Sequence, residues 1–206
     1  GYAFAFTSTG GTEAVSLSGT PDRALTEMTI CLWMKTNQSS DTNGTPLSYT
    51  ANGRKNEIAI NDYKNFNLKI GRRNVWNLFL ISANDGRWHH ICLTWRSSNG
   101  SWNFYKDGTL AASGSPLNAR HVIKAGGCLV LGQSQKDVCG VFKADKRFFG
   151  LLANVNIWDQ VLSYTAITAM SHSCYSGIGN VVKWLDFSDA VMGNVEVTPS
   201  TCKPES

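Results

Sequence analysis

The sequence predicts an all-β sandwich with one short helix. Short apolar runs of strand length recur between turns that are rich in Gly, Asn, Asp and Ser. Many of these turns contain an Asx-Gly pair, which favours a hairpin because both residues tolerate positive φ. With 206 residues, 42% of them hydrophobic, and with 7 Trp and 9 Phe, the chain can bury a sizeable core.

The predicted strands follow one another along the whole chain. The alternation is clearest at 90–97, where Ile91, Leu93 and Trp95 share one face and Cys92 and Thr94 share the other. We expect the other strands at 2–6, 28–36, 57–61, 66–70, 76–82, 102–106, 128–131 and 151–158.

One segment departs from the strand pattern. Ser163 is a suitable N-cap, because a serine side chain can accept a hydrogen bond from an N–H of the first helical turn. We therefore predict a short helix over 164–171, with Ile167 and Met170 on its inward side.

The organisation indicates a single domain over 1–202, followed by a tail or linker at 203–206. The chain does not open with Met or with a signal peptide, so we expect a mature product or an excised domain. No apolar run is long enough to span a membrane. We therefore expect no membrane insertion by this segment. The net charge of +4 comes without a basic helical stripe, so we expect no nucleic-acid binding.

The cysteines and the glycosylation motifs indicate an extracellular location. Six cysteines suggest an oxidising compartment, and about 15 pairings are possible if all six are bridged. A thiolate metal site is disfavoured, because no Cys-x-x-Cys is present. Asn37, Asn43 and Asn99 each open an Asn-x-Ser/Thr acceptor motif in turn-rich sequence.

The strand at 90–97 also carries a family motif. Its residues His90, Cys92, Thr94, Trp95 and Ser97 match the pattern His-x-Cys-x-Ser/Thr-Trp-x-Ser/Thr. The chain therefore resembles the pentraxin family, and the resemblance runs from about residue 3 to residue 202. It implies a two-sheet antiparallel jelly-roll sandwich of the concanavalin and pentraxin type, with a single helix.

The resemblance also implies disulfide pairings. The bridge shared by the family joins the strand of Cys31 to Cys92. By analogy with the neuronal members, Cys174 is expected to pair with Cys202. Cys128 and Cys139 remain as plausible partners of each other.

Members of the family bind ligands through two calcium ions, and here the resemblance shows a departure. Calcium takes about six to eight oxygen ligands, whereas a lysine side chain offers donors and no oxygen. We therefore expect no calcium at this site and no other cofactor. The positions that correspond to the family's calcium-binding loops are occupied by Lys55, Asn56, Ser134, Gln135, Lys136, Lys143 and Lys146.

These basic residues leave two alternatives open. They are either solvated loop charges, some of them paired with Asp137 and Asp145, or a basic patch that receives an acidic glycan, a phosphate or an acidic partner without calcium. The patch hypothesis names Arg54, Lys55, Lys136, Lys143, Lys146 and Arg147 as ligand-binding residues.

No catalytic residue is predicted. The sequence contains no Gly-x-Ser-x-Gly, His-Glu-x-x-His or phosphate-binding loop. His90 belongs to the strand motif and is expected to be structural. Asp186 and Asp189 lie close together, but nothing else supports an acid–base pair, so an enzyme acting on glycans is disfavoured.

We therefore predict a non-catalytic extracellular module for recognition or adhesion that has lost the calcium-dependent site of its family. It would belong to a larger cell-surface receptor, such as an adhesion G-protein-coupled receptor, and bind an extracellular protein or an acidic glycan. The alternative is a secreted, oligomeric pentraxin of the innate-immune or neuronal type. The oligomeric state in solution distinguishes the receptor module from the secreted oligomer.

Overall fold

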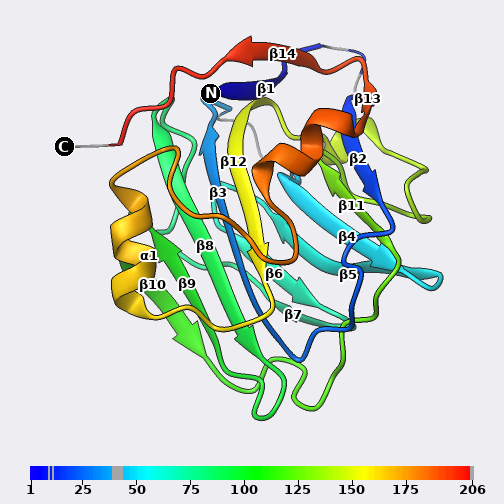
Figure 1. Cartoon of the computed structure of the whole chain (residues 1–206), viewed down its shortest axis with the longest axis vertical. Coiled ribbons are helices and arrows are strands. Elements are labelled where there is room, and N and C mark those ends of the chain that lie inside the picture. The colour runs from blue at the N-terminus through cyan, green and yellow to red at the C-terminus, as the bar shows by residue number, and fades with distance from the viewer. Residues whose placement is uncertain (9, 11, 39–43, 205–206) are drawn as a thin grey trace.

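The computed structural model describes residues 1–8, 10, 12–38 and 44–204. Two β-sheets pack face to face, and within the described residues each contains seven antiparallel strands (Figure 1). The first sheet contains, in spatial order, β10 (Thr109–Gly114), β9 (Trp102–Lys106), β8 (Trp88–Arg96), β3 (Glu27–Lys35), β12 (Gly150–Trp158), β1 (Tyr2–Phe6) and β14 (Glu196–Pro199). The second contains β13 (Val191–Gly193), β2 (Ala14–Ser18), β11 (Cys128–Leu131), β4 (Leu47–Ala51), β5 (Arg54–Asn61), β6 (Asn67–Ile70) and β7 (Arg73–Val75).

The predicted sandwich is confirmed, and its core lies between the two sheets. Trp95 of β8 is fully buried, and its indole N–H donates to the carbonyl of Leu117 at 2.8 Å. From the facing layer, Phe66 packs on Phe104 with ring centroids 4.9 Å apart. Because alternate residues of each strand point inwards, the apolar side chains of the two sheets meet in one cluster.

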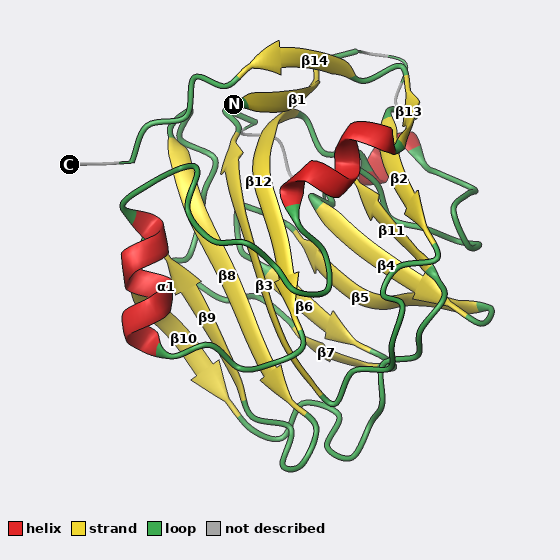
Figure 2. Cartoon of the chain, in the orientation of Figure 1, coloured by secondary structure: helices red, strands yellow, loops and turns green. Residues whose placement is uncertain are grey.

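The helix α1 (Tyr164–Ser171) begins where the sequence predicts it. The hydroxyl oxygen of Ser163 accepts a hydrogen bond from the N–H of Ala166 at 3.2 Å. The helix lies outside the first sheet, near β8, β9 and β10 (Figure 2). Its buried residues Ile167 and Met170 join a small cluster with the Cys31–Cys92 disulfide. The helix therefore covers the outer face of β8.

Among the described residues, no helix is long and apolar enough to cross a membrane.

The predicted strand at 76–82 is wrong. β7 ends at Val75, and the following residues form a loop in which Leu78 is buried while Phe79 and Leu80 are exposed. The backbone has positive φ at Asn77 (53°) and at Leu80 (67°), a conformation that a regular strand does not contain. The apolar run therefore belongs to an exposed loop.

A histidine between two carboxylates ties β8 to the turn between β9 and β10. His89 contacts Asp107 through Nδ1 at 2.7 Å and Asp85 through Nε2 at 2.9 Å. Burial opposes the charge on His89, but its hydrogen bonds with Asp107 and Asp85 raise its pKa. For Asp85 and Asp107, burial alone would raise the pKa of the carboxylate. The hydrogen bond with His89 outweighs this effect, and the pKa of each carboxylate is lowered.

These shifts predict how stability depends on pH. A raised histidine pKa contributes stability in full below the unfolded value of about 6.5, and the contribution is lost as pH rises through the folded value. Because the pKa values of Asp85 and Asp107 are also lowered, their contribution to stability is lost when the carboxylates become protonated, as pH falls below about 4. His89→Gln is therefore expected to lower the free energy of unfolding by about 1.5–3 kcal/mol between these limits, and by less at higher pH.

Urea unfolding of both proteins from about pH 4 to about pH 9 measures this difference. The neighbouring His90 is present in both proteins, so its own titration cancels in the comparison. A difference that stays constant as pH rises above about 6.5 would show that the charge on His89 contributes nothing.

Candidate ligand-binding face

The candidate site lies on the outer face of the second sheet. Ile58 and Ile60 of β5 point into the core. The β4–β5 register is irregular between Tyr49 and Ala51, and there Asn56 contacts Ser134 on the outer side. The segment between β11 and β12 folds back over this face: Phe142 packs against Cys128 and Val130. The segments that correspond, by the resemblance, to the calcium-binding loops of the family thus meet on this face.

Gln135 fixes the first part of that segment. Its side-chain N–H groups donate to the carbonyls of Ser48 at 3.2 Å and Cys128 at 3.0 Å. Its side-chain oxygen accepts from the N–H of Cys139 at 2.8 Å. The residue is 1% exposed, so its amide serves the fold and not a bound ligand.

Asn56 joins β5 to the same segment. Its amide nitrogen donates to the hydroxyl of Ser134 at 2.8 Å, and its amide oxygen accepts from the N–H of Gln135 at 3.1 Å. The backbone of Asn56 has a φ of 46°, which asparagine tolerates better than most residues. Both neutral amides, at the positions that the resemblance aligns with calcium ligands of the family, are therefore used within the protein.

Three lysines converge around this junction. Lys55 precedes Asn56 on β5, Lys136 follows Gln135, and Lys143 lies just before the 3₁₀ turn η1 (Ala144–Lys146). The pKa of Lys136 is lowered, first by its side-chain contact with Lys143 and also by the charge of Lys55, while Asp145 acts in the opposite direction. All three lysines are exposed. We call Lys55, Lys136 and Lys143 the lysine cluster.

The backbone contacts of the remaining patch residues show where these residues lie. Lys146 ends η1, and its N–H donates to the carbonyl of Lys143 at 3.0 Å. Arg147 forms a parallel β-bridge with Thr45. Arg54 lies on β5, but its side chain is outside the described part of the chain.

The sequence prediction missed two further basic residues. A hollow of about 440 Å³ beside Lys55 is lined by Lys69 and Arg72. Burial lowers the pKa of Lys69, and the negative charge of Glu57 partly offsets this. Lys69 pairs with Ala59 across β5 and β6, so only the strand register reveals that it lies on this face.

The chemistry of these residues does not fit a calcium ion. Calcium needs about six to eight oxygens, with carboxylates among them to offset its charge. The carboxylate of Glu57 is 1% exposed and contacts the imidazole of His121. The charge of Asp145 acts on Lys136, but the contact with Lys143 and the charge of Lys55 act on the same ammonium group in the opposite direction. An ammonium group repels a divalent cation and offers it no electron pair.

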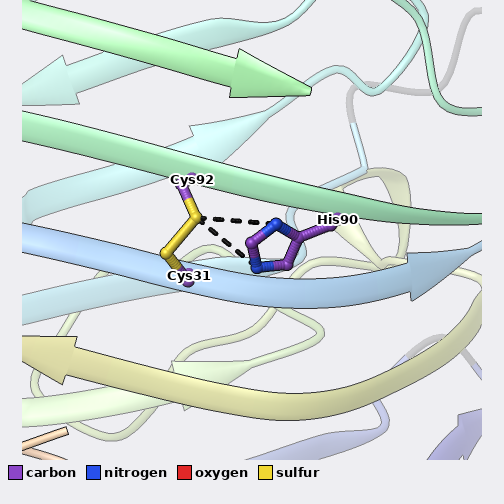
Figure 3. A group of neighbouring side chains, drawn as sticks. All are labelled: Cys31, His90 and Cys92. Atoms are coloured by element: carbon purple, nitrogen blue, oxygen red, sulfur yellow. Dashed lines mark hydrogen bonds between the residues drawn. A yellow bond between two sulfur atoms is a disulfide. The ribbon is translucent and has the colours of Figure 1, made fainter. Parts of the chain in front are cut away.

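The described residues contain one other group with metal-ligand chemistry: Cys31, His90 and Cys92 (Figure 3). The Cys92 sulfur lies 3.6 Å from Nε2 of His90. The two sulfurs are joined in a disulfide, so they cannot act as thiolate ligands. Burial lowers the pKa of His90 to about 4, which keeps the ring neutral. The group is a structural part of the sheet.

The structure contains the three disulfides that the sequence and the resemblance predict. They join Cys31 to Cys92, Cys128 to Cys139 and Cys174 to Cys202. The second closes the segment that carries Gln135 and Lys136, so it holds one side of the lysine cluster in place.

The predicted glycosylation positions are only partly described. Asn37 and Asn99 are exposed, as an acceptor must be. The side-chain oxygen of Asn99 accepts from the N–H of Ser101 at 2.9 Å. Asn43 lies outside the described residues.

A family model described as the Pentaxin family matches residues 2–199 of the chain. The chain belongs to this family. Neuronal pentraxin-2 of Cavia porcellus is 36% identical to this pentaxin domain over 180 residues, which cover 87% of the chain and 42% of the relative. The sushi, von Willebrand factor type A, EGF and pentraxin domain-containing protein 1 of Rattus norvegicus is 39% identical over 180 residues, which cover 84% of the chain and 5% of the relative.

The pentaxin domain thus spans less than half the length of these two relatives. Family membership makes it a non-catalytic, lectin-like domain.

Solved structures share the fold of the pentaxin domain. The native heptameric SAP-like pentraxin from Limulus polyphemus matches 97% of the chain and 94% of its own length, with a TM-score of 0.81 and 22% identity. The full extracellular region of zebrafish Gpr126/Adgrg6 matches 98% of the chain over 27% of its own length, with a TM-score of 0.73 and 20% identity. At these identities the likeness concerns the fold alone.

Proposed function

We propose that this pentaxin domain is an extracellular recognition module that binds an anionic ligand on its lysine cluster without calcium. The ligand is an acidic glycan or an acidic segment of an extracellular protein. The convergence of Lys55, Lys136 and Lys143 carries the proposal, because β5 and the segment between β11 and β12 bring like charges together on one exposed face. Sulfate or carboxylate groups would relieve that repulsion.

The surroundings of the lysine cluster support an anion over a cation. The amide oxygens of Asn56 and Gln135 already accept hydrogen bonds from the protein, and the carboxylate of Glu57 is buried. Lys69 and Arg72 extend the basic surface into the adjoining hollow. An elongated polyanion would therefore meet ammonium and guanidinium groups, while the Glu57 carboxylate that also lines the hollow is buried.

The proposed setting is a larger cell-surface receptor. The relative of which the chain covers 5% favours a larger multidomain protein. The extracellular region of which the chain covers 27% favours a cell-surface setting. A secreted oligomer is the alternative, favoured by the likeness to neuronal pentraxin-2 and to a heptameric pentraxin. Sedimentation velocity separates them: a monomer or dimer supports the receptor setting, and a ring supports the secreted form.

The first test of ligand binding uses a heparin octasaccharide as the probe, in buffer containing a calcium chelator. We expect saturable binding that weakens with added salt, because exposed charge pairs are screened. Lys136→Gln combined with Lys143→Gln should weaken binding about tenfold, since each exposed contact contributes up to about 1 kcal/mol.

A matched control removes the same charge elsewhere. Lys106 and Lys203 lie on or beyond the first sheet, and replacing both with Gln also lowers the formal net charge from +4 to +2. If both double variants lose affinity equally, the binding follows net charge and not the lysine cluster. If binding requires calcium, the proposal fails outright.

A further inference from the structure

A second hollow lies on the opposite side of the sandwich, on the outer face of the first sheet. It measures about 290 Å³, near the lower end for small-molecule sites, which begin at about 300 Å³. The segment that joins α1 to η2 (Trp184–Asp189) passes in front of β12 and forms one wall (Figure 1). Its apolar lining includes Tyr2, Ala153, Tyr175, Ile178, Trp184 and Leu185.

The walls of this hollow are fixed by hydrogen bonds. Asn154 donates from its side chain to the carbonyl of Ser176 at 2.8 Å. The side-chain oxygen of Asn156 accepts from the N–H of Gly179 at 3.1 Å and from that of Trp184 at 3.3 Å. The Cys174–Cys202 disulfide closes the same region. The polar groups of the wall are therefore occupied, and the hollow is formed before a ligand arrives.

The lining is aromatic at its base and apolar at its rim. Tyr2 stacks on Trp184 with ring centroids 4.7 Å apart, and its hydroxyl donates to the carbonyl of Trp184 at 2.9 Å. At the rim, Tyr175 is 62% exposed, Ile178 77% and Leu185 68%. An apolar surface of this kind, gathered around a hollow, is suited to an apolar ligand.

The charged groups around the hollow indicate which class of ligand it can bind. Lys183 is exposed, and among the described residues that line the hollow its side chain brings a positive charge while none brings a carboxylate. Burial, with the charge of Asp186 in second place, raises the pKa of Tyr2 to about 12, so this ring stays neutral. Asp186 itself accepts a hydrogen bond from the N–H of Lys183 at 2.9 Å and does not line the hollow.

We propose that this hollow binds a small amphipathic anion, with an aromatic or aliphatic body in the hollow and one carboxylate or sulfonate group at Lys183. The body contacts Tyr2, Trp184 and Ala153, and the rim residues cover its outer side. This site is independent of the lysine cluster, which lies on the other sheet.

The test uses 1-anilinonaphthalene-8-sulfonate as a fluorescent probe, with decanoate as the competitor. We expect one saturable site per chain. Ile178→Ser combined with Leu185→Ser should weaken binding of the probe at least about tenfold, because both remove apolar area from the rim. The control is Phe79→Ser with Leu80→Ser, which removes two similarly exposed apolar side chains from a loop outside the hollow and should leave affinity unchanged.

The charge is tested separately with Lys183→Gln. This variant should weaken binding of decanoate about twofold to fivefold and leave that of uncharged decanol unchanged. The proposal is overturned if no saturable binding occurs up to about 1 mM probe, if the rim and control variants behave alike, or if Lys183→Gln affects decanoate no more than decanol. Variants of the lysine cluster should leave this binding intact.

Discussion

Replacing Cys31 and Cys92 together with alanine is expected to lower the free energy of unfolding by about 4 kcal/mol. The two cysteines are 61 residues apart in sequence, so their bridge removes much of the freedom of the unfolded chain. Both side chains are buried between the first sheet and α1, and alanine leaves no polar atom there. Guanidinium unfolding followed by tryptophan fluorescence measures the loss.

The Cys128–Cys139 bridge provides the matched comparison. It closes only 11 positions, so its removal by the same substitutions should cost about 3 kcal/mol. The order of the two costs is the diagnostic result. If the short bridge costs as much as the long one, constraint of the unfolded chain does not explain their contribution.

The second large effect is a gain of calcium binding. Lys55→Asp, Ser134→Glu, Lys136→Asp and Lys143→Glu together place four carboxylates on the candidate face and remove its three exposed ammonium groups. We expect this variant to be stabilised by about 2.7 kcal/mol when calcium is present at about 100 times its Kd. Thermal unfolding with and without calcium measures the change.

An amide version of the same variant is the control. Lys55→Asn, Ser134→Gln, Lys136→Asn and Lys143→Gln have nearly the same shapes but add no negative charge. The amide variant should unfold at the same temperature in calcium and in chelator. If the carboxylate variant also ignores calcium, the loops of this face do not converge as described, and the inference drawn from them is wrong.

The sequence predicts the parts of the fold that depend on local pattern. Alternation at 90–97 identifies the inward side of β8, and Ser163 identifies the start of α1. It does not reveal β14, because Glu196–Pro199 is a mostly exposed edge strand that forms by pairing with β1. The loop at 76–82 has the composition of a strand, and only its tertiary setting distinguishes the two.

Some residues of the candidate site can likewise be predicted from the sequence, and others cannot. Lys55, Lys136 and Lys143 are identified by position within motifs, so the resemblance is enough to find them. Lys69 is not, because it reaches the face through the register of β5 with β6. The hollow near Lys183 is assembled from segments far apart in the chain, and no local pattern marks it.

The most direct test of the central claim is a calorimetric titration of the unmodified domain with calcium, accompanied by its unfolding temperature in calcium and in chelator. The account predicts no saturable heat and no change in unfolding temperature, because ammonium groups occupy the positions where carboxylates are needed. Saturable heat with a rise in unfolding temperature would contradict it, since oxygens such as those of Asp137 or Asp145 would then form a calcium site in a different arrangement.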